Sequence, residues 1–181
     1  MAGIVRIVVS GEIGCGKSTA VRAAMKQLGW AAPGGFFTHW DGRARGATRL
    51  LLETWTGERC VLARRLAGET GDPDRPPYEL DRAAVARAAA ACRPAAAAER
   101  PVVIDELGPL ELAAPEFAEA MARVFRGSAP VLAVVQRRAL DRWLGIIGRE
   151  HATHFIEVES ATRDELPGRI VALFRAGFQA S

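Results

Sequence analysis

The sequence has few cysteines and no long apolar segment. Its three cysteines, Cys15, Cys60 and Cys92, stand far apart without a Cys-x-x-Cys pair, which argues against a zinc site and a disulfide framework. The N-terminal apolar run over residues 4–9 is interrupted by an arginine and is too short for a signal sequence. No segment approaches the length of a membrane span. We therefore expect a cytoplasmic protein with no membrane partner.

Lysine is also scarce, because only Lys17 and Lys26 among the 24 basic residues are lysine. The formal charge is +3 and the pI is about 9.1, values that also occur in nucleic-acid-binding proteins. The arginines, however, form no run or stripe, and no aromatic residues lie between them. The sequence therefore does not favour a nucleic-acid partner, and it identifies no protein partner.

The length and composition are those of one soluble domain. Hydrophobic residues make up 49% of the 181 residues and charged residues 25%, which is ordinary for a globular protein. A chain of this length can bury one full hydrophobic core but is too short for two cores of ordinary size. We therefore expect residues 1–181 to form a single domain.

Short apolar or β-branched runs alternate with helical stretches along the chain. The strands we expect are residues 4–9, 35–40, 48–54, 59–65, 102–104, 131–135 and 155–158. The helices we expect are residues 17–28, 80–92, 115–126, 138–147 and 162–174. This alternation predicts an α/β fold with a mainly parallel sheet and helices on both faces. The exceptions are a β-hairpin formed by residues 48–54 and 59–65, and a long loop over residues 66–78 that is rich in Gly and Pro.

A phosphate-binding motif follows the first strand. The segment Gly11-Glu12-Ile13-Gly14-Cys15-Gly16-Lys17-Ser18 matches GxxxxGK[ST] at every fixed position. Glycines allow backbone N–H groups to face phosphate oxygens, and the N-terminus of the next helix adds a positive dipole end. Lys17 would reach the β- and γ-phosphates, and the Ser18 hydroxyl would bind Mg²⁺. The motif lies between a strand and a helix, as it does in P-loop proteins.

Two carboxylates follow the strand at residues 102–104. Ligands gather at the carboxyl ends of parallel strands, so we expect Asp105 and Glu106 to face the phosphate-binding loop. Asp105 would hold Mg²⁺ as a Walker B acid does, and Glu106 would orient and polarise an attacking water. A kinase needs no base aimed at water, so this pair favours hydrolysis over phosphoryl transfer.

The segment Ile-Asp-Glu-Leu-Gly-Pro-Leu-Glu-Leu at residues 104–112 resembles the signature of one family. This family is the thermophile-type P-loop nucleoside-triphosphatases, which include the cancer-related nucleoside-triphosphatase. Gly35-Phe36-Phe37-Thr38, the hairpin around Thr56-Gly57, and Thr162-Arg163-Asp164-Glu165-Leu166-Pro167 are similar to further family segments, in the same order. The resemblance implies a RecA-like α/β core and slow hydrolysis of several nucleoside triphosphates to diphosphate and phosphate.

Two further polar residues are candidates for contacts with the nucleotide. Gln136 follows the strand at residues 131–135 and could sense the γ-phosphate, or be an ordinary polar residue at a strand end. Arg163, at the start of the last predicted helix, could contact the base or a phosphate, or lie free on the surface. No NKxD-type guanine motif is present, so the sequence fixes no base preference.

Three classes of function remain open: a nucleoside-triphosphatase, a nucleoside or nucleotide kinase, and a nucleotide-dependent switch. We favour Mg²⁺-dependent hydrolysis of ATP, GTP and other triphosphates, with Glu106 and Lys17 as catalytic residues and Ser18 and Asp105 as metal ligands. The residues assigned to nucleotide binding are Gly11, Glu12, Ile13, Gly14, Cys15, Gly16, Lys17, Ser18, Thr19, Gln136 and Arg163.

Overall fold

The computed structural model describes residues 4–42, 48–66, 77–159 and 162–179. The strands are β1 (Arg6–Gly11), β2 (Gly34–Trp40), β3 (Arg49–Thr54), β4 (Arg59–Arg65), β5 (Tyr78–Leu80), β6 (Val102–Leu107), β7 (Val131–Gln136) and β8 (His154–Val158). The helices are α1 (Lys17–Leu28), α2 (Arg82–Ala97), α3 (Pro115–Arg126), α4 (Leu140–Ile147) and α5 (Leu166–Gln179). Short 3-10 turns occupy Glu111–Ala113, Arg137–Ala139 and Arg149–His151.

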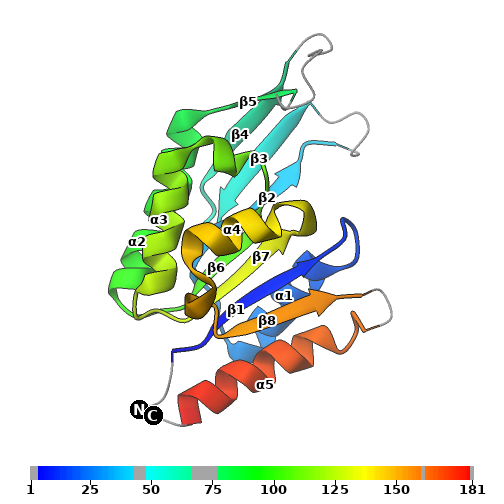
Figure 1. The fold of residues 1–181 in the computed structure, drawn as a ribbon, viewed down its shortest axis with the longest axis vertical. Helices are drawn as coiled ribbons and strands as arrows, with labels where there is room; N and C mark the ends of the chain where they lie inside the picture. Colours follow the sequence, from blue (N-terminus) through cyan, green and yellow to red (C-terminus); the bar gives the residue numbers. More distant parts are fainter. Residues whose placement is uncertain (1–3, 43–47, 67–76, 160–161, 180–181) are drawn as a thin grey trace.

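The eight strands form one sheet in the order β5-β4-β3-β2-β6-β7-β1-β8 (Figure 1). The neighbouring pairs β2–β6, β6–β7, β7–β1 and β1–β8 are parallel. The pairs β2–β3, β3–β4 and β4–β5 are antiparallel. The predicted hairpin is therefore present as β3 and β4, and it extends the parallel part of the sheet through β2.

Helices cover both faces of the sheet, as the alternating pattern predicts. One core lies under α1 and α5 and includes Ile7, Val9 and Phe174. The other lies under α2, α3 and α4 and includes Phe36, Phe117 and Trp143. Strands β1, β6 and β7 are buried almost throughout, because they lie between the two helical layers.

Some element boundaries differ from those predicted. Helix α2 continues through Pro94 to Ala97, although we expected it to end at residue 92. Tyr78 begins strand β5, which pairs with β4, although we assigned it to a long loop. The rest of that predicted loop, apart from Leu66 and Pro77, lies outside the described residues. Arg163 lies in a turn before α5 and not inside the last helix.

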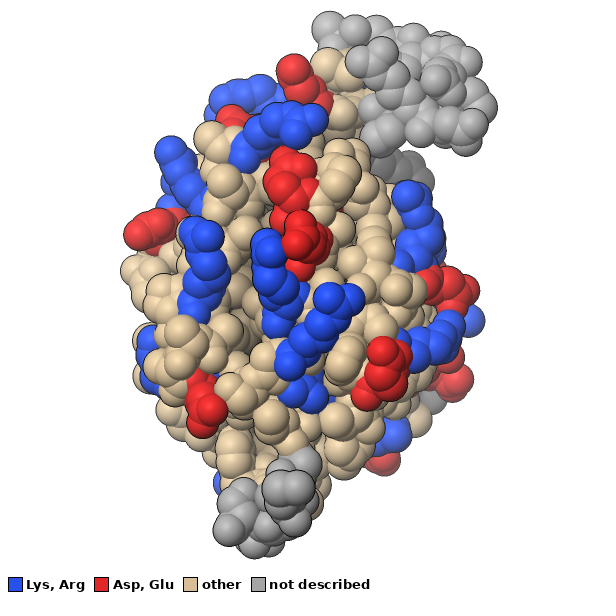
Figure 2. All heavy atoms as spheres, turned by 60° about the vertical axis from the view of Figure 1, so that its left-hand side comes forward, with Lys and Arg blue, Asp and Glu red and all other residues tan. Residues whose placement is uncertain are grey.

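The described helices include none with both the length and the apolar character that crossing a membrane requires. Figure 2 shows the side of the molecule that carries α2 and α3. On that face Lys and Arg side chains alternate with Asp, Glu and uncharged residues.

Candidate active site

The phosphate-binding loop connects β1 to α1 at the carboxyl edge of the parallel strands. Gly14 and Gly16 have positive φ angles of 81° and 97°, a conformation that glycine adopts without steric cost. A Cβ atom on Gly11 would lie 2.7 Å from the carbonyl oxygen of Val158 in β8, so the strand can approach β8 closely only with glycine there. Helix α1 begins at Lys17, and its first N–H groups therefore point into the loop.

Lys17 is buried inside this loop. Its Nζ donates hydrogen bonds to the carbonyl oxygens of Gly11 at 2.9 Å and Glu12 at 2.6 Å. The loop therefore holds a cation at its start, close to the N-terminus of α1. This combination of a positive helix end and an ammonium group binds phosphate oxygens in P-loop proteins.

Ser18 and Asp105 lie side by side although they are far apart in sequence. The Ser18 hydroxyl donates to Asp105 Oδ1 at 2.9 Å. Burial raises the pKa of Asp105 to about 6, against the hydrogen bond from Ser18, which lowers it. A hydroxyl and a carboxylate are hard oxygen ligands of the kind that Mg²⁺ prefers. A cation here would also stabilise the ionised form of a buried carboxyl group, so these residues fit the metal predicted from the sequence.

Glu106 is held by Gln136 at the end of the neighbouring strand. Gln136 Nε2 donates to Glu106 Oε1 at 2.5 Å, and Gln136 is also the register partner of Gly11 in the phosphate-binding loop. Burial raises the pKa of Glu106, and the hydrogen bond from Gln136 and the charge of Lys17 partly oppose this rise. A raised carboxylate pKa brings a general base closer to the pH at which it works.

A small cavity adjoins Glu106 and Gln136. Its volume is about 90 Å³, and Thr38 and Trp40 from β2 form part of its wall. This volume holds a few water molecules but does not enclose a nucleoside. The cavity therefore provides space for water beside the carboxylate.

A buried carboxyl group supports the segment that follows Glu106. Glu111 Oε2 accepts a hydrogen bond from the Gly108 N–H at 2.9 Å, and the Trp143 indole donates to the Gly108 carbonyl at 3.0 Å. Glu111 is only 4% exposed, and burial raises its pKa to about 7. Both backbone polar groups of Gly108 are thus satisfied, and α4 is fixed to the end of β6.

Arg163 lies beside the phosphate-binding loop. A Cβ atom on Gly16 would lie 3.7 Å from Arg163 Cδ, and Arg163 and Thr19 both line a cavity of about 380 Å³ between α1 and the start of α5. The remaining loop residues differ in exposure: Cys15 is buried, whereas the Ile13 side chain is 76% exposed. The carboxylate of Glu12 pairs with Arg137 at 3.2 Å.

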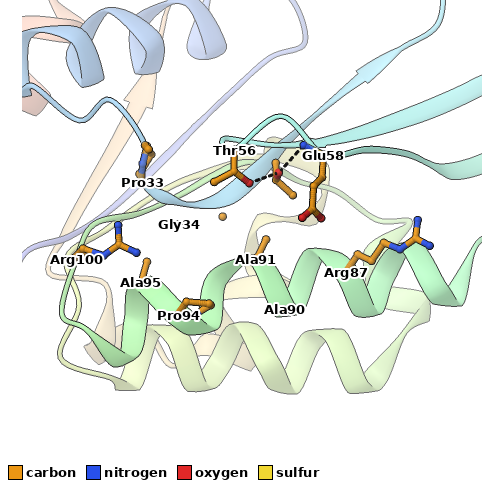
Figure 3. A pocket seen from close by; sticks show the side chains of 13 residues that line it. Pro33, Gly34, Thr56, Glu58, Arg87, Ala90, Ala91, Pro94, Ala95 and Arg100 are labelled. Carbon is orange, nitrogen blue, oxygen red and sulfur yellow. Dashed lines mark hydrogen bonds between the residues drawn. The ribbon is translucent and has the colours of Figure 1, made fainter.

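A second large cavity lies at the opposite edge of the sheet (Figure 3). It has a volume of about 340 Å³ and lies where β2 begins, between Gly34, the β3–β4 turn at Thr56 and Glu58, and the α2 residues Ala91 and Ala95. None of the site residues predicted from the sequence lines it.

The predicted catalytic and metal-binding residues therefore lie together at one edge of the sheet, with Arg163 on the α5 side. Three residues that surround them were not predicted from the sequence: Arg138, Glu111 and Trp143. Arg138 was assigned no role from the sequence, although its Nε donates to Gln136 Oε1 at 3.1 Å. Its position two residues after Gln136 was the one available signal.

The fold and this edge define the class of protein. A glycine-rich loop between the first strand and the first helix, with a serine and a strand-borne carboxylate beside it, is the arrangement of P-loop nucleotide-binding proteins. The chain belongs to the NTPase family, whose sequence pattern matches residues 6–171.

Two relatives extend this result. The chain is 35% identical to the nucleoside-triphosphatase THEP1 of Thermococcus kodakarensis over 162 residues, which cover 83% of this chain and 86% of the relative. It is 31% identical to the nucleoside-triphosphatase THEP1 of Methanosarcina barkeri over 179 residues, or 95% and 98% of the two chains. The family resemblance found in the sequence is therefore confirmed.

Two solved structures share the fold. The crystal structure of THEP1 from Aquifex aeolicus aligns with a TM-score of 0.70 at 22% identity and covers 94% of this chain and 99% of that one. The solution structure of a human cancer-related nucleoside triphosphatase aligns with a TM-score of 0.73 at 22% identity and covers 95% and 98%. The predicted fold, a P-loop NTPase with a RecA-like, mainly parallel sheet and an added hairpin, is confirmed.

Proposed function

We propose that this protein hydrolyses the terminal phosphate of nucleoside 5'-triphosphates, including ATP and GTP, to give a diphosphate and phosphate in a Mg²⁺-dependent reaction. The relatives that share the family are named nucleoside-triphosphatases. The observation that carries the proposal is the position of Glu106, a carboxylate beside both the phosphate-binding loop and a cavity with room for water.

The phosphate-binding loop, residues 11–19, binds the triphosphate in this proposal. Its backbone N–H groups and the start of α1 contact phosphate oxygens, and Lys17 exchanges its carbonyl partners for oxygens of the β- and γ-phosphates. Arg163 and Thr19 lie where the nucleoside extends from the loop, in the cavity between α1 and α5. That cavity is lined largely by small side chains, which favours weak discrimination between bases.

Ser18 and Asp105 are the proposed metal ligands. When bound there, Mg²⁺ would neutralise charge on the β- and γ-phosphate oxygens. The hydrogen bond between Ser18 and Asp105 holds both side chains in position. Asp105, with a pKa of about 6, is mostly ionised at neutral pH and can serve as a ligand.

Glu106 is the proposed base. Gln136 holds one carboxylate oxygen and leaves the other able to accept a hydrogen bond from water in the cavity. The water oxygen attacks the γ-phosphorus, its proton passes to Glu106, and the bond from the γ-phosphorus to the β–γ bridging oxygen breaks. The electron pair stays on the diphosphate. The cavity beside Glu106 has room for water, which supports hydrolysis over a kinase reaction.

We propose further that residues 1–181 form one domain and that the protein works in the cytoplasm without a membrane or nucleic-acid partner. The eight strands of the described residues belong to one sheet, which supports a single domain. Cys15, Cys60 and Cys92 are all free thiols, which suits a reducing compartment.

Phosphate release from a panel of triphosphates tests the function directly. The assay is run with Mg²⁺, with and without nucleosides and nucleoside monophosphates as acceptors. K17A, purified in parallel, reveals any contaminating phosphatase. We expect the wild type to release phosphate from several triphosphates at a rate that acceptors do not change. Transfer of the phosphate to an acceptor, or equal release by K17A, would refute the proposal.

A further inference from the structure

Two consecutive arginines follow β7, and they have different partners. Arg137 is engaged on both sides, by Glu12 at 3.2 Å and by Glu157 at 3.1 Å. Arg138 instead turns toward Gln136, to whose Oε1 its Nε donates at 3.1 Å. Within the described parts of the chain, its two terminal nitrogens have neither a hydrogen-bond nor an ion-pair partner. Arg138 therefore offers a planar pair of free donors.

The contact with Gln136 determines which way the Gln136 amide faces. A side-chain amide has one accepting oxygen and one donating nitrogen. Because Arg138 binds the oxygen, the nitrogen points to Glu106, to which it donates. Arg138, Gln136 and Glu106 thus form a chain of hydrogen bonds that ends at the proposed base.

This chain lies next to the phosphate-binding loop. Gln136 pairs with Gly11, the first residue of the loop, in the register of β7 with β1. Arg138, Gln136 and Glu106 also line the same small cavity. The guanidinium group therefore lies on the side of the site that carries Glu106, the proposed base.

Phosphoryl transfer to water needs positive charge at this place. Charge spreads over the oxygens of the transferred phosphoryl group in the transition state, and preorganised cations stabilise it. Lys17 supplies one cation from inside the loop. Among the arginine and lysine side chains of the described residues, Arg138 is the one that lines the cavity with Glu106, which His39 also lines.

We propose that Arg138 stabilises the transition state of hydrolysis through its terminal guanidinium nitrogens, while its Nε keeps Gln136 and Glu106 in position. This inference rests on the proposed hydrolysis. The water oxygen forms the new bond to the γ-phosphorus and gives its proton to Glu106, and the bridging bond breaks with its electron pair on the diphosphate. Arg138 remains protonated throughout and only donates hydrogen bonds.

The test compares R138A, R138K and R138Q with R142A, which removes an exposed arginine of α4 that does not line the cavity. Single-turnover hydrolysis gives the rate, and calorimetry gives affinities for a non-hydrolysable triphosphate and for the transition-state mimic formed by ADP, Mg²⁺ and aluminium fluoride. Circular dichroism checks that each variant folds.

We expect R138A and R138Q to lose about 10³-fold or more in rate, as expected for loss of an arginine that acts on the transition state. Affinity for the non-hydrolysable triphosphate should stay within a few-fold, and the mimic should lose its tighter binding. R138K keeps the charge and should recover part of the rate, methylguanidinium should partly rescue R138A, and R142A should match the wild type.

Three results would overturn the inference: R138A within tenfold of the wild-type rate, R138K no faster than R138Q, or a loss of triphosphate affinity equal to the loss of rate. Each of these requires an active wild type. A wild type that releases no phosphate would instead refute the proposed hydrolysis, so the two failures are distinguishable.

Discussion

Glu111 provides a direct physical test of the structure, because an ionisable group is buried beside the proposed site. Glu111 is 4% exposed, and its carboxyl group accepts a hydrogen bond from the Gly108 N–H. Burial raises its pKa from an ordinary value of 4.5 to about 7. The E111Q variant keeps an oxygen that can accept this hydrogen bond, and it stays neutral at every pH.

The direction of the pH effect follows from the shift. Between pH 4.5 and 7 the unfolded chain has an ionised Glu111, whereas the folded protein keeps it protonated. The stabilisation that the neutral group provides is therefore complete below pH 4.5 and is lost as the pH rises through 7. The shift of about 2.5 pKa units corresponds to roughly 3 kcal/mol.

Urea unfolding of the wild type and E111Q at pH 5 and pH 8 measures this effect. We expect an advantage for E111Q of about 1 kcal/mol or less at pH 5 and of roughly 3 kcal/mol at pH 8, where it moves the midpoint by about 1–3 M urea. Asp105 and Glu106 titrate in both proteins, so their effects largely cancel in the comparison. The exposed Glu116 of α3 supplies the control E116Q, which should follow the wild type at both pH values.

Parallel stability curves for the wild type and E111Q would refute this reasoning. They would mean that Glu111 is hydrated or ionised in the folded protein, and therefore that its side chain is not buried as described.

Further predictions concern the nucleotide. K17A should abolish tight binding of a non-hydrolysable triphosphate, because it removes the cation inside the loop; unchanged affinity in calorimetry would contradict the P-loop assignment. D105N should weaken binding of the Mg²⁺–triphosphate as well as turnover. E106Q can still accept the hydrogen bond from Gln136, so it should bind normally and lose about 10² to 10⁴ in kcat, the loss expected for a general base; wild-type turnover by E106Q would contradict the mechanism. Across a panel of triphosphates, kcat/KM should vary by less than about a hundredfold, or roughly 2.7 kcal/mol, and a larger ratio would reveal a base-specific pocket.

The phosphate-binding loop could be predicted from the sequence because its structure is local. Gly14 and Gly16 have the positive φ angles for which glycine is needed, and Lys17 and Ser18 follow at fixed spacing. The acidic pair was equally accessible, because parallel strands bring their carboxyl ends to one edge. That both carboxylates face the phosphate-binding loop could be deduced without knowing the full strand order.

Two features depended on contacts that a local pattern does not contain. Helix α2 continues through Pro94 because Ala95 beyond it is buried against the start of β2, where a Cβ atom on Gly34 would lie 2.3 Å from Ala95 Cβ. The helix continues there without the hydrogen bond that proline cannot donate. The position of Arg138 could not be predicted for another reason. Its link to Glu106 runs through Gln136, and Gln136 and Glu106 are 30 residues apart in sequence.

The change of strand direction at β2 also has a consequence for engineering the protein. The parallel strands are joined by crossover segments that include helices, so a change in one connection can disturb a helix, whereas antiparallel neighbours need only a turn. The β3–β4 turn lies at the edge of the sheet away from the phosphate-binding loop, and Gly57 within it has nothing within 4 Å of the place of a Cβ atom. A foreign segment spliced in at Gly57 would lengthen one exposed turn and leave every crossover unchanged, so this turn is the place to attach a label or a tether.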